Sequence, residues 1–247
     1  MPSIIRCLRA EFLKCKHSPV LYLHLLVPII GAVVFAGYFR ISSWNVVTEI
    51  SAYLEVLAVA FPFLIGIIIG MIVQIENQAG HFQLMLGTIP SRSAAYIGKL
   101  AFLLISAMGA TVLALGTFCM IYGKISLSFY IKAWLFLIAT ILPLYLIYLF
   151  IGMRFGKGAC MGLGIAGSLI SALMITGLGD AVWKYIPWAW SVRTMDYLVL
   201  AWNKPDTMQL VQADFATGIW IAVLFSICSF VASLIWFRYW EGGKNND

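Results

Sequence analysis

The sequence predicts an all-α integral membrane protein with six transmembrane helices, and three observations lead to this prediction. Of the 247 residues, 62% are hydrophobic and only 11% are charged, against roughly 45–50% and about 25% in soluble domains. The apolar residues gather in six runs without Asp, Glu, Lys or Arg, each near the ~20 residues that a helix needs to cross a bilayer. No run alternates with a period of two, which excludes a membrane β-barrel.

The six uncharged runs define the predicted spans and leave no room for a soluble catalytic domain. They cover residues 18–39, 56–73, 100–122, 133–153, 158–179 and 215–237. The first run is too long for the apolar core of a signal peptide, and no small-residue cleavage site follows it. We therefore expect a permanent first span and a single transmembrane domain over residues 1–247.

The distribution of charge predicts that both termini lie in the cytoplasm. With the N-terminus inside, the cytoplasmic segments hold ten of the 16 basic residues and four acids, which accounts for the net charge of +6. Such an excess of Lys and Arg on the cytoplasmic side is the positive-inside rule. The basic charge therefore indicates membrane topology and contact with anionic lipid, and not nucleic-acid binding.

Residues 1–17 are expected to form an amphipathic helix along the inner leaflet. Apolar side chains recur there at helical spacing, and the basic side chains lie off that stripe. The stripe consists of Ile4, Ile5, Leu8, Phe12 and Cys15. The alternative is a fraying cytoplasmic tail. Ser18 and Pro19 mark the point where the chain turns into the membrane.

The cytoplasmic stretch 74–98 is the most informative part of the sequence. Four apolar residues follow the i, i+3, i+4, i+7 pattern of a short helix, which a glycine and a proline then end. These four are Phe82, Met85, Leu86 and Ile89. A helix of this kind lies in the interface or seats in a groove on a cytosolic partner. Lys99 then enters the next span, where we expect it to reach back to the interface as an anchor.

The segment 180–214 is the longest predicted outer element. It contains four of the nine tryptophans, and Val192, Met195 and Val199 predict that part of it is helical. The four are Trp183, Trp188, Trp190 and Trp202. Interfacial tryptophans ordinarily anchor a loop, and the alternative is contact with a ligand. Asp196 could then attract a cationic molecule.

Two glycine motifs imitate nucleotide sites and fail as such. The run 152–158 resembles a P-loop but has three residues between its first two glycines and lacks the following Ser or Thr. The glycines at 162, 164 and 167 lie within an apolar run, with no strand before them. Small residues there predict close helix packing, through Gly158 and Gly162 as through Gly66 and Gly70.

The sequence offers no catalytic, cofactor or metal site. Its three histidines form no metal-binding motif, and no carboxylate lies inside a predicted span except Glu55 and Glu76 at the ends. His24 is the one strongly ionisable side chain within a span, which indicates a hydrogen bond to a neighbouring helix or a place on a substrate path. A chain with neither a proton relay nor an ATP site is expected to obtain its energy from a separate ATPase.

Two segments of the sequence resemble parts of a known family of membrane proteins. The run 76–92 reads ENQAGHFQLMLGTIPSR and is followed by Gly98-Lys99, which is similar to the coupling segment of ABC-2-type permeases. The opening RAEFLK at 9–14 resembles their N-terminal elbow helix. Within that superfamily the whole chain looks most like the lantibiotic-immunity permeases.

The resemblance implies a permease subunit of an ATP-driven exporter that expels an antimicrobial peptide from a bacterial cell membrane. It implies two copies of a cytosolic ATPase, which carry the ATP and Mg²⁺, and a second permease subunit that is identical or homologous. The residues implied to meet the ATPase are Glu76, Gly80, Phe82, Met85, Leu86, Ile89, Pro90 and Arg92. Gln78 stands where related exporters often have an acid.

The alternative functions differ in the exported molecule or in the class of protein. The nearest is an exporter of another antibiotic of the bacitracin kind, of a lipid or of a small drug. An intramembrane enzyme or a scaffold is the reading from another class, although the spans show no catalytic constellation. Candidate substrate contacts are Trp183, Trp188, Trp190, Asp196, Trp202 and His24.

Overall fold

A computed structural model describes residues 2–16, 18–80, 82–83, 87 and 91–242, and this part of the chain contains helices and no strand. The helices are α1 (Pro2–Cys15), α2 (Pro19–Ile41), α3 (Val46–Gln78), α5 (Arg92–Tyr122), α6 (Leu127–Leu173), α7 (Pro187–Asn203) and α8 (Pro205–Tyr239). Two short 3₁₀ helices, Gly177–Gly179 and Trp183–Tyr185, lie between α6 and α7. The all-α prediction is confirmed.

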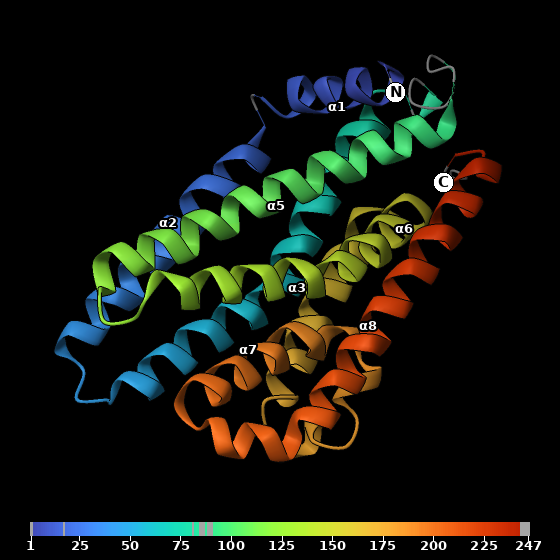
Figure 1. Cartoon of the computed structure of the whole chain (residues 1–247). Coiled ribbons are helices and arrows are strands. Elements are labelled where there is room, and N and C mark those ends of the chain that lie inside the picture. The colour runs from blue at the N-terminus through green and yellow to red at the C-terminus, as the bar shows by residue number, and fades with distance from the viewer. Residues whose placement is uncertain (1, 17, 81, 84–86, 88–90, 243–247) are drawn as a thin grey trace.

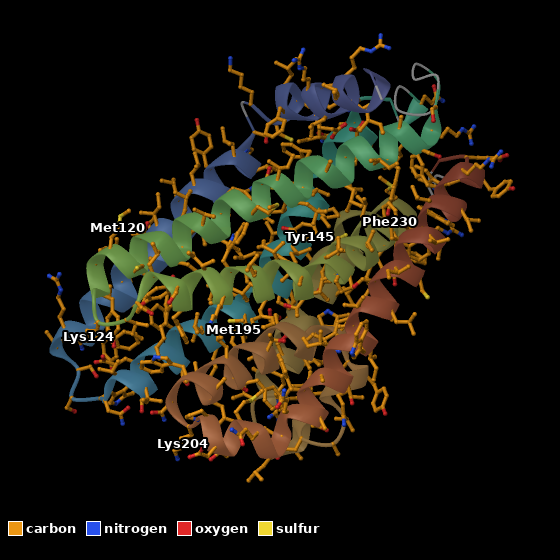
Figure 2. All side chains as sticks on the ribbon, viewed as in Figure 1. Met120, Lys124, Tyr145, Met195, Lys204 and Phe230 are labelled. Carbon is orange, nitrogen blue, oxygen red and sulfur yellow. The ribbon has the colours of Figure 1, made fainter. Side chains whose placement is uncertain are left out.

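The long helices run beside one another, and α1 lies across one end of them (Figure 1). The N-terminus, the start of α5 and the end of α8 share that end, which we call the inner end. Met120 and Lys124 lie at the other end, the outer end (Figure 2). Five helices are long and apolar enough to cross a membrane: α2, α3, α5, α6 and α8. A multi-pass membrane protein is thereby confirmed.

Helix α6 is a hairpin of two helical limbs. Its backbone leaves helical geometry at Gly156, where φ is 84° and ψ is −174°, a conformation that glycine adopts without the steric cost of a Cβ atom. The hydroxyl of Tyr148 donates to the carbonyl of Leu163 at 3.0 Å, whereas residues 15 apart in a straight helix are ~22 Å apart. The uncharged runs 133–153 and 158–179 therefore lie on opposite limbs.

Glycines bring the second limb of α6 against α3. A Cβ atom on Gly66 would lie 2.6 Å from the carbonyl oxygen of Cys160, and one on Gly164 would lie 3.1 Å from that of Pro62. The predicted packing role of Gly66 is confirmed. Gly158 and Gly162 do not form such a contact within this chain, because a Cβ atom there would meet nothing within 4 Å. The contact uses Gly164, on a different face of the helix.

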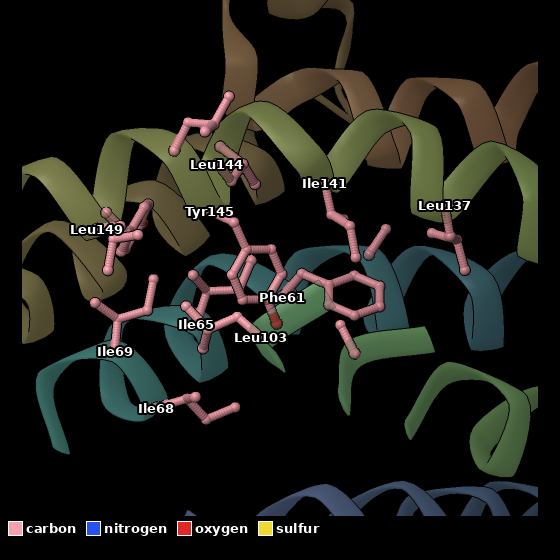
Figure 3. Packing of buried hydrophobic residues seen from close by; sticks show 14 of the residues in the cluster. Phe61, Ile65, Ile68, Ile69, Leu103, Leu137, Ile141, Leu144, Tyr145 and Leu149 are labelled. Carbon is pink, nitrogen blue, oxygen red and sulfur yellow. The ribbon is translucent and has the colours of Figure 1, made fainter. Parts of the chain in front are cut away.

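The main core lies between α3, α5 and the first limb of α6. Figure 3 shows Phe61 and Ile65 of α3 against Ile141 and Tyr145 of α6, with Leu103 of α5 on the other side. All five are buried. This packing holds α3 as the central helix of the molecule.

The predicted outer helix is present as α7, but it is packed inside the protein. Ala189, Val192 and Met195 are fully buried, so this helix is not pressed into the outer leaflet as the sequence had indicated. Its apolar face packs against α3, α6 and α8 instead of lipid. Helix α7 is therefore part of the core at the outer end.

Candidate functional site

A buried ion-pair network joins three helices at the inner end. The ammonium of Lys99 on α5 donates to Glu11 of α1 at 2.5 Å and to Glu76 of α3 at 2.7 Å. The ammonium of Lys14 donates to Glu11 at 2.8 Å and to Glu76 at 2.6 Å. Lys99 is 1% exposed and Glu76 is 4% exposed. We call these four side chains the inner ion network.

Local sequence brings these charges together. Glu11 and Lys14 are three residues apart and share one face of α1, while Glu76 lies in the last turn of α3. Gly98 allows α1 to approach α5, because a Cβ atom there would lie 2.6 Å from the Cβ of Cys7. Lys99, next along α5, thereby reaches both carboxylates.

The network balances two acids against two bases, which is what makes burial of these charges tolerable. Burial by itself lowers the pKa of Lys14, but the nearby carboxylates of Glu11 and Glu76 outweigh it and raise the pKa above its usual value. Two expectations need correction. Lys99 does not reach out to the interface, and Glu76 faces the protein interior and is not offered to a partner.

The residues that follow α3 are held against the end of α8. The ring of Phe82 lies 5.0 Å from that of Trp240, edge to face, and both side chains are buried. Phe82 has a φ of 67° and lies in a turn just before helical Gln83, and its buried ring is not an exposed docking face. Arg92 donates to the carbonyls of Arg238 and Trp240 at 3.2 and 3.1 Å.

The other predicted coupling residues are divided between described and undescribed parts of the chain. Gly80 is exposed and has a φ of 112°. Met85, Leu86, Ile89 and Pro90 lie outside the described residues. Both ends of the segment 79–91 are thus fixed to the body of the protein, through α3 and α5, with α1 and α8 attached beside them.

The outer tryptophans divide into core and surface residues. Trp183 and Trp190 are each 1% exposed, and their indole N–H groups donate to Asp214 and to the carbonyl of Lys184. Trp188 donates to the hydroxyl of Tyr148 at 3.1 Å. Trp202 is 41% exposed. Trp188 is half-buried, so Trp202 is the most exposed of the four.

Asp196 on α7 lies beside Glu55 of α3. Burial, and then the charge of Glu55, raise the pKa of Asp196 to about 7, against a partial opposing effect of Arg193. The folded protein therefore holds a proton there between about pH 4 and pH 7 that the unfolded chain releases. Stability should fall as the pH rises through this window.

Replacing Asp196 by asparagine removes this penalty. We expect Asp196→Asn to raise the free energy of unfolding by roughly 1–3 kcal/mol at pH 8 and to change little at pH 4. Thermal unfolding of the solubilised protein at both pH values measures this. Asp206→Asn, at an exposed position, is the matched control. Equal shifts at the two pH values would contradict the assignment.

His24 of α2 is buried, with 7% exposure. Its Nδ1 lies 2.8 Å from the carbonyl oxygen of Val20, one turn earlier in the same helix. The predicted hydrogen bond to a neighbouring helix is therefore not present among the described residues.

The apolar helices define the chain as a multi-pass membrane protein. Lipid-length helices fill the chain, and the described residues contain no group of three or more His, Cys, Asp or Glu that could hold a metal. Residues 7–174 match the family described as ABC-2 family transporter protein, and the chain belongs to it.

Family membership makes this chain a membrane transport subunit that works with an ABC ATPase. The match runs from Cys7, within α1, to just past the end of α6, and it includes the whole inner ion network. Neither the search of curated proteins nor the search of solved structures gave a match.

Proposed function

We propose that this chain is the permease subunit of an ABC exporter that expels an amphiphilic antimicrobial peptide of the lantibiotic class from a bacterial cell membrane. Both limbs of α6 cross the membrane, which gives six spans. Helix α1 lies on the inner leaflet as the elbow helix, and both termini are cytoplasmic. Two copies of a cytosolic ATPase and a second permease subunit complete the transporter.

The observation that carries this proposal is the inner ion network beside the segment 79–91. A coupling segment must receive movement from an ATPase and pass it to membrane helices. Here the segment leaves α3 three residues after Glu76 and enters α5 seven residues before Lys99. The two helices are joined by that ion pair, and α1 is joined to both. Movement of the segment would therefore displace α1, α3 and α5 as one unit.

Site-specific photo-crosslinking tests the position of the ATPase. Gln83 lies in the segment and is exposed, whereas Met120 is 87% exposed near the outer end of α5, roughly 40 Å of helix away from Arg92. With a benzophenone amino acid at residue 83, we expect an adduct with the partner ABC ATPase. The same amino acid at residue 120 should give none.

Two crosslinking outcomes would contradict the proposal. An adduct from residue 120 and none from residue 83 would place the ATPase at the wrong end and overturn the proposed orientation. An ATPase that co-purifies but forms no adduct at residue 83 would remove the coupling role of this segment. The benzophenone leaves Phe82, Arg92 and the inner ion network unchanged.

A resistance assay tests the cargo. Cells that gain this chain together with its partner ATPase and second permease subunit should survive several-fold more of a cationic lantibiotic, with no change in survival of bacitracin. Trp202→Ala should reduce this gain, because an exposed aromatic ring can hold an amphiphilic peptide in the interface. Trp220→Ala, at an exposed position on α8, should not. Resistance to bacitracin alone would replace the peptide cargo by that antibiotic.

A further inference from the structure

An apolar cavity of about 150 Å³ lies between α2, α3, α5 and α6. Its walls are almost entirely aliphatic and aromatic, with Ala32 on α2, Phe61 and Ile65 on α3, and Tyr145 on α6 among them. Figure 3 shows the last three converging from their helices. Val27 and Val56, also in the lining, are 37% and 47% exposed. The cavity therefore opens towards lipid between α2 and α3.

The polar group that distinguishes this cavity is the imidazole of His24. The carbonyl of Val20 can only accept, so Nδ1 carries a proton and donates to it at 2.8 Å. In the neutral ring, Nε2 is then an acceptor. It is buried and has no hydrogen-bond partner among the described residues. A buried acceptor without a donor is costly.

A second cavity of about 270 Å³ lies on the other side of the same histidine, between α1, α2 and α5. It is lined by Phe12, Cys15 and Phe102 among others, and by exposed Lys16 at the inner end. His24 lines both cavities. The His24 ring thus lies between two apolar spaces, and its unpartnered nitrogen is buried there.

We propose that the cavity beside His24 binds a ring-sized apolar group that carries a single O–H or N–H donor, which it donates to His24 Nε2. A cavity of this volume with apolar walls holds a molecule of about the size of benzene. Water does not suit it, since a buried water requires two to four polar partners. A lipid acyl chain would fill the space and leave Nε2 without a donor.

Binding of such a group does not depend on the export function. The further step, that this group is an aromatic side chain of the exported amphiphile as it leaves the inner leaflet, rests on the proposed function. Phenol is the appropriate probe for the site itself, because it combines a benzene ring with one donor. Fluorobenzene has nearly the same shape and no donor.

The experiment uses the full chain in lipid nanodiscs, labelled with ¹⁵N in its three histidines. The ring signal lost in His24→Gln identifies His24. We expect phenol to give a saturable shift of the His24 Nε2 resonance, and fluorobenzene to give a clearly smaller one. Gly31→Phe should abolish the phenol shift, because a Cβ atom on Gly31, a lining residue, meets nothing within 4 Å and the added ring has room to occupy the cavity.

Gly37→Phe is the matched control on the same helix, since Gly37 also has free space but does not line either cavity. The proposal is overturned if phenol gives no saturable shift, if fluorobenzene gives an equal one, or if the shift survives Gly31→Phe. Contacts from lipid acyl chains to the His24 ring that phenol does not displace would also overturn it. None of these outcomes involves an ATPase, so failure here is distinct from failure of the export proposal.

Discussion

Lys99→Met should destabilise the protein by about 3–5 kcal/mol, the effect of removing one partner from a buried ion pair. Glu11 and Glu76, which are 5% and 4% exposed, would keep only Lys14 as a counter-charge. Methionine fills a similar volume, so the loss reflects charge rather than a cavity. Unfolding of the solubilised protein in denaturant measures the change, and hydrogen exchange should show α1 opening first.

Two controls make the result specific to the network. Arg9→Met removes an exposed charge from α1 and should change stability by less than about 0.5 kcal/mol. In the triple variant Glu11→Gln, Glu76→Gln and Lys99→Met, no buried charge lacks its partner, so much of the lost stability should return. Wild-type stability in Lys99→Met would show that the charges are hydrated and that the helices are held together by other contacts.

The membrane class and the places of the helices could be predicted because hydropathy reports them directly. Each uncharged run lies within a helix, apart from Ser18 at the start of the first run and the end of the fifth run, where η1 follows α6. The break in α6 could be located too, since Arg154 and Lys157 interrupt the apolar pattern on either side of Gly156. Periodicity shows which positions are apolar and where the pattern stops, and these features suffice for that part of the fold.

The inner ion network could not be predicted, because its members are distant in sequence. Glu11 and Lys99 are 88 residues apart, and a single sequence does not show which acid meets which base. A lysine at the start of a span ordinarily reaches to the interface, and this was the interpretation given to Lys99. The signal that could have corrected it is Gly98, a small residue that allows another helix to approach at the same turn.

The tryptophans show a second limit. A tryptophan in an outer segment is usual both in a membrane belt and in a core, and composition does not separate the two. Trp183 is buried because it faces Gly218 on α8, where a Cβ atom would collide with the indole ring. The large residue and the small residue that receives it are 35 positions apart. Only the packed structure shows that they belong together.

The glycines of α3 and α6 also show that sequence spacing alone does not identify packing contacts, and they permit a direct test. Motif spacing marked Gly66, Gly158 and Gly162 alike as packing positions. In the structure Gly66 faces the backbone of the second α6 limb, where its Cβ atom would lie 2.6 Å from the Cys160 carbonyl oxygen and 3.0 Å from the Gly164 Cα. Backbone atoms on both sides leave no flexible side chain to move aside.

Gly66→Leu should therefore cost about 3 kcal/mol or more, at or above the upper end for overpacking, because α3 and α6 must separate. Gly162→Leu places the same side chain on α6 at an exposed position with nothing within 4 Å. There the better helix propensity of leucine should leave stability unchanged or raise it by up to about 1 kcal/mol. Thermal unfolding of both variants in one detergent provides the comparison. Equal losses would mean that Gly162 also faces a helix, for example in a second permease subunit, whereas a stable Gly66→Leu would show that α3 and α6 do not approach this closely.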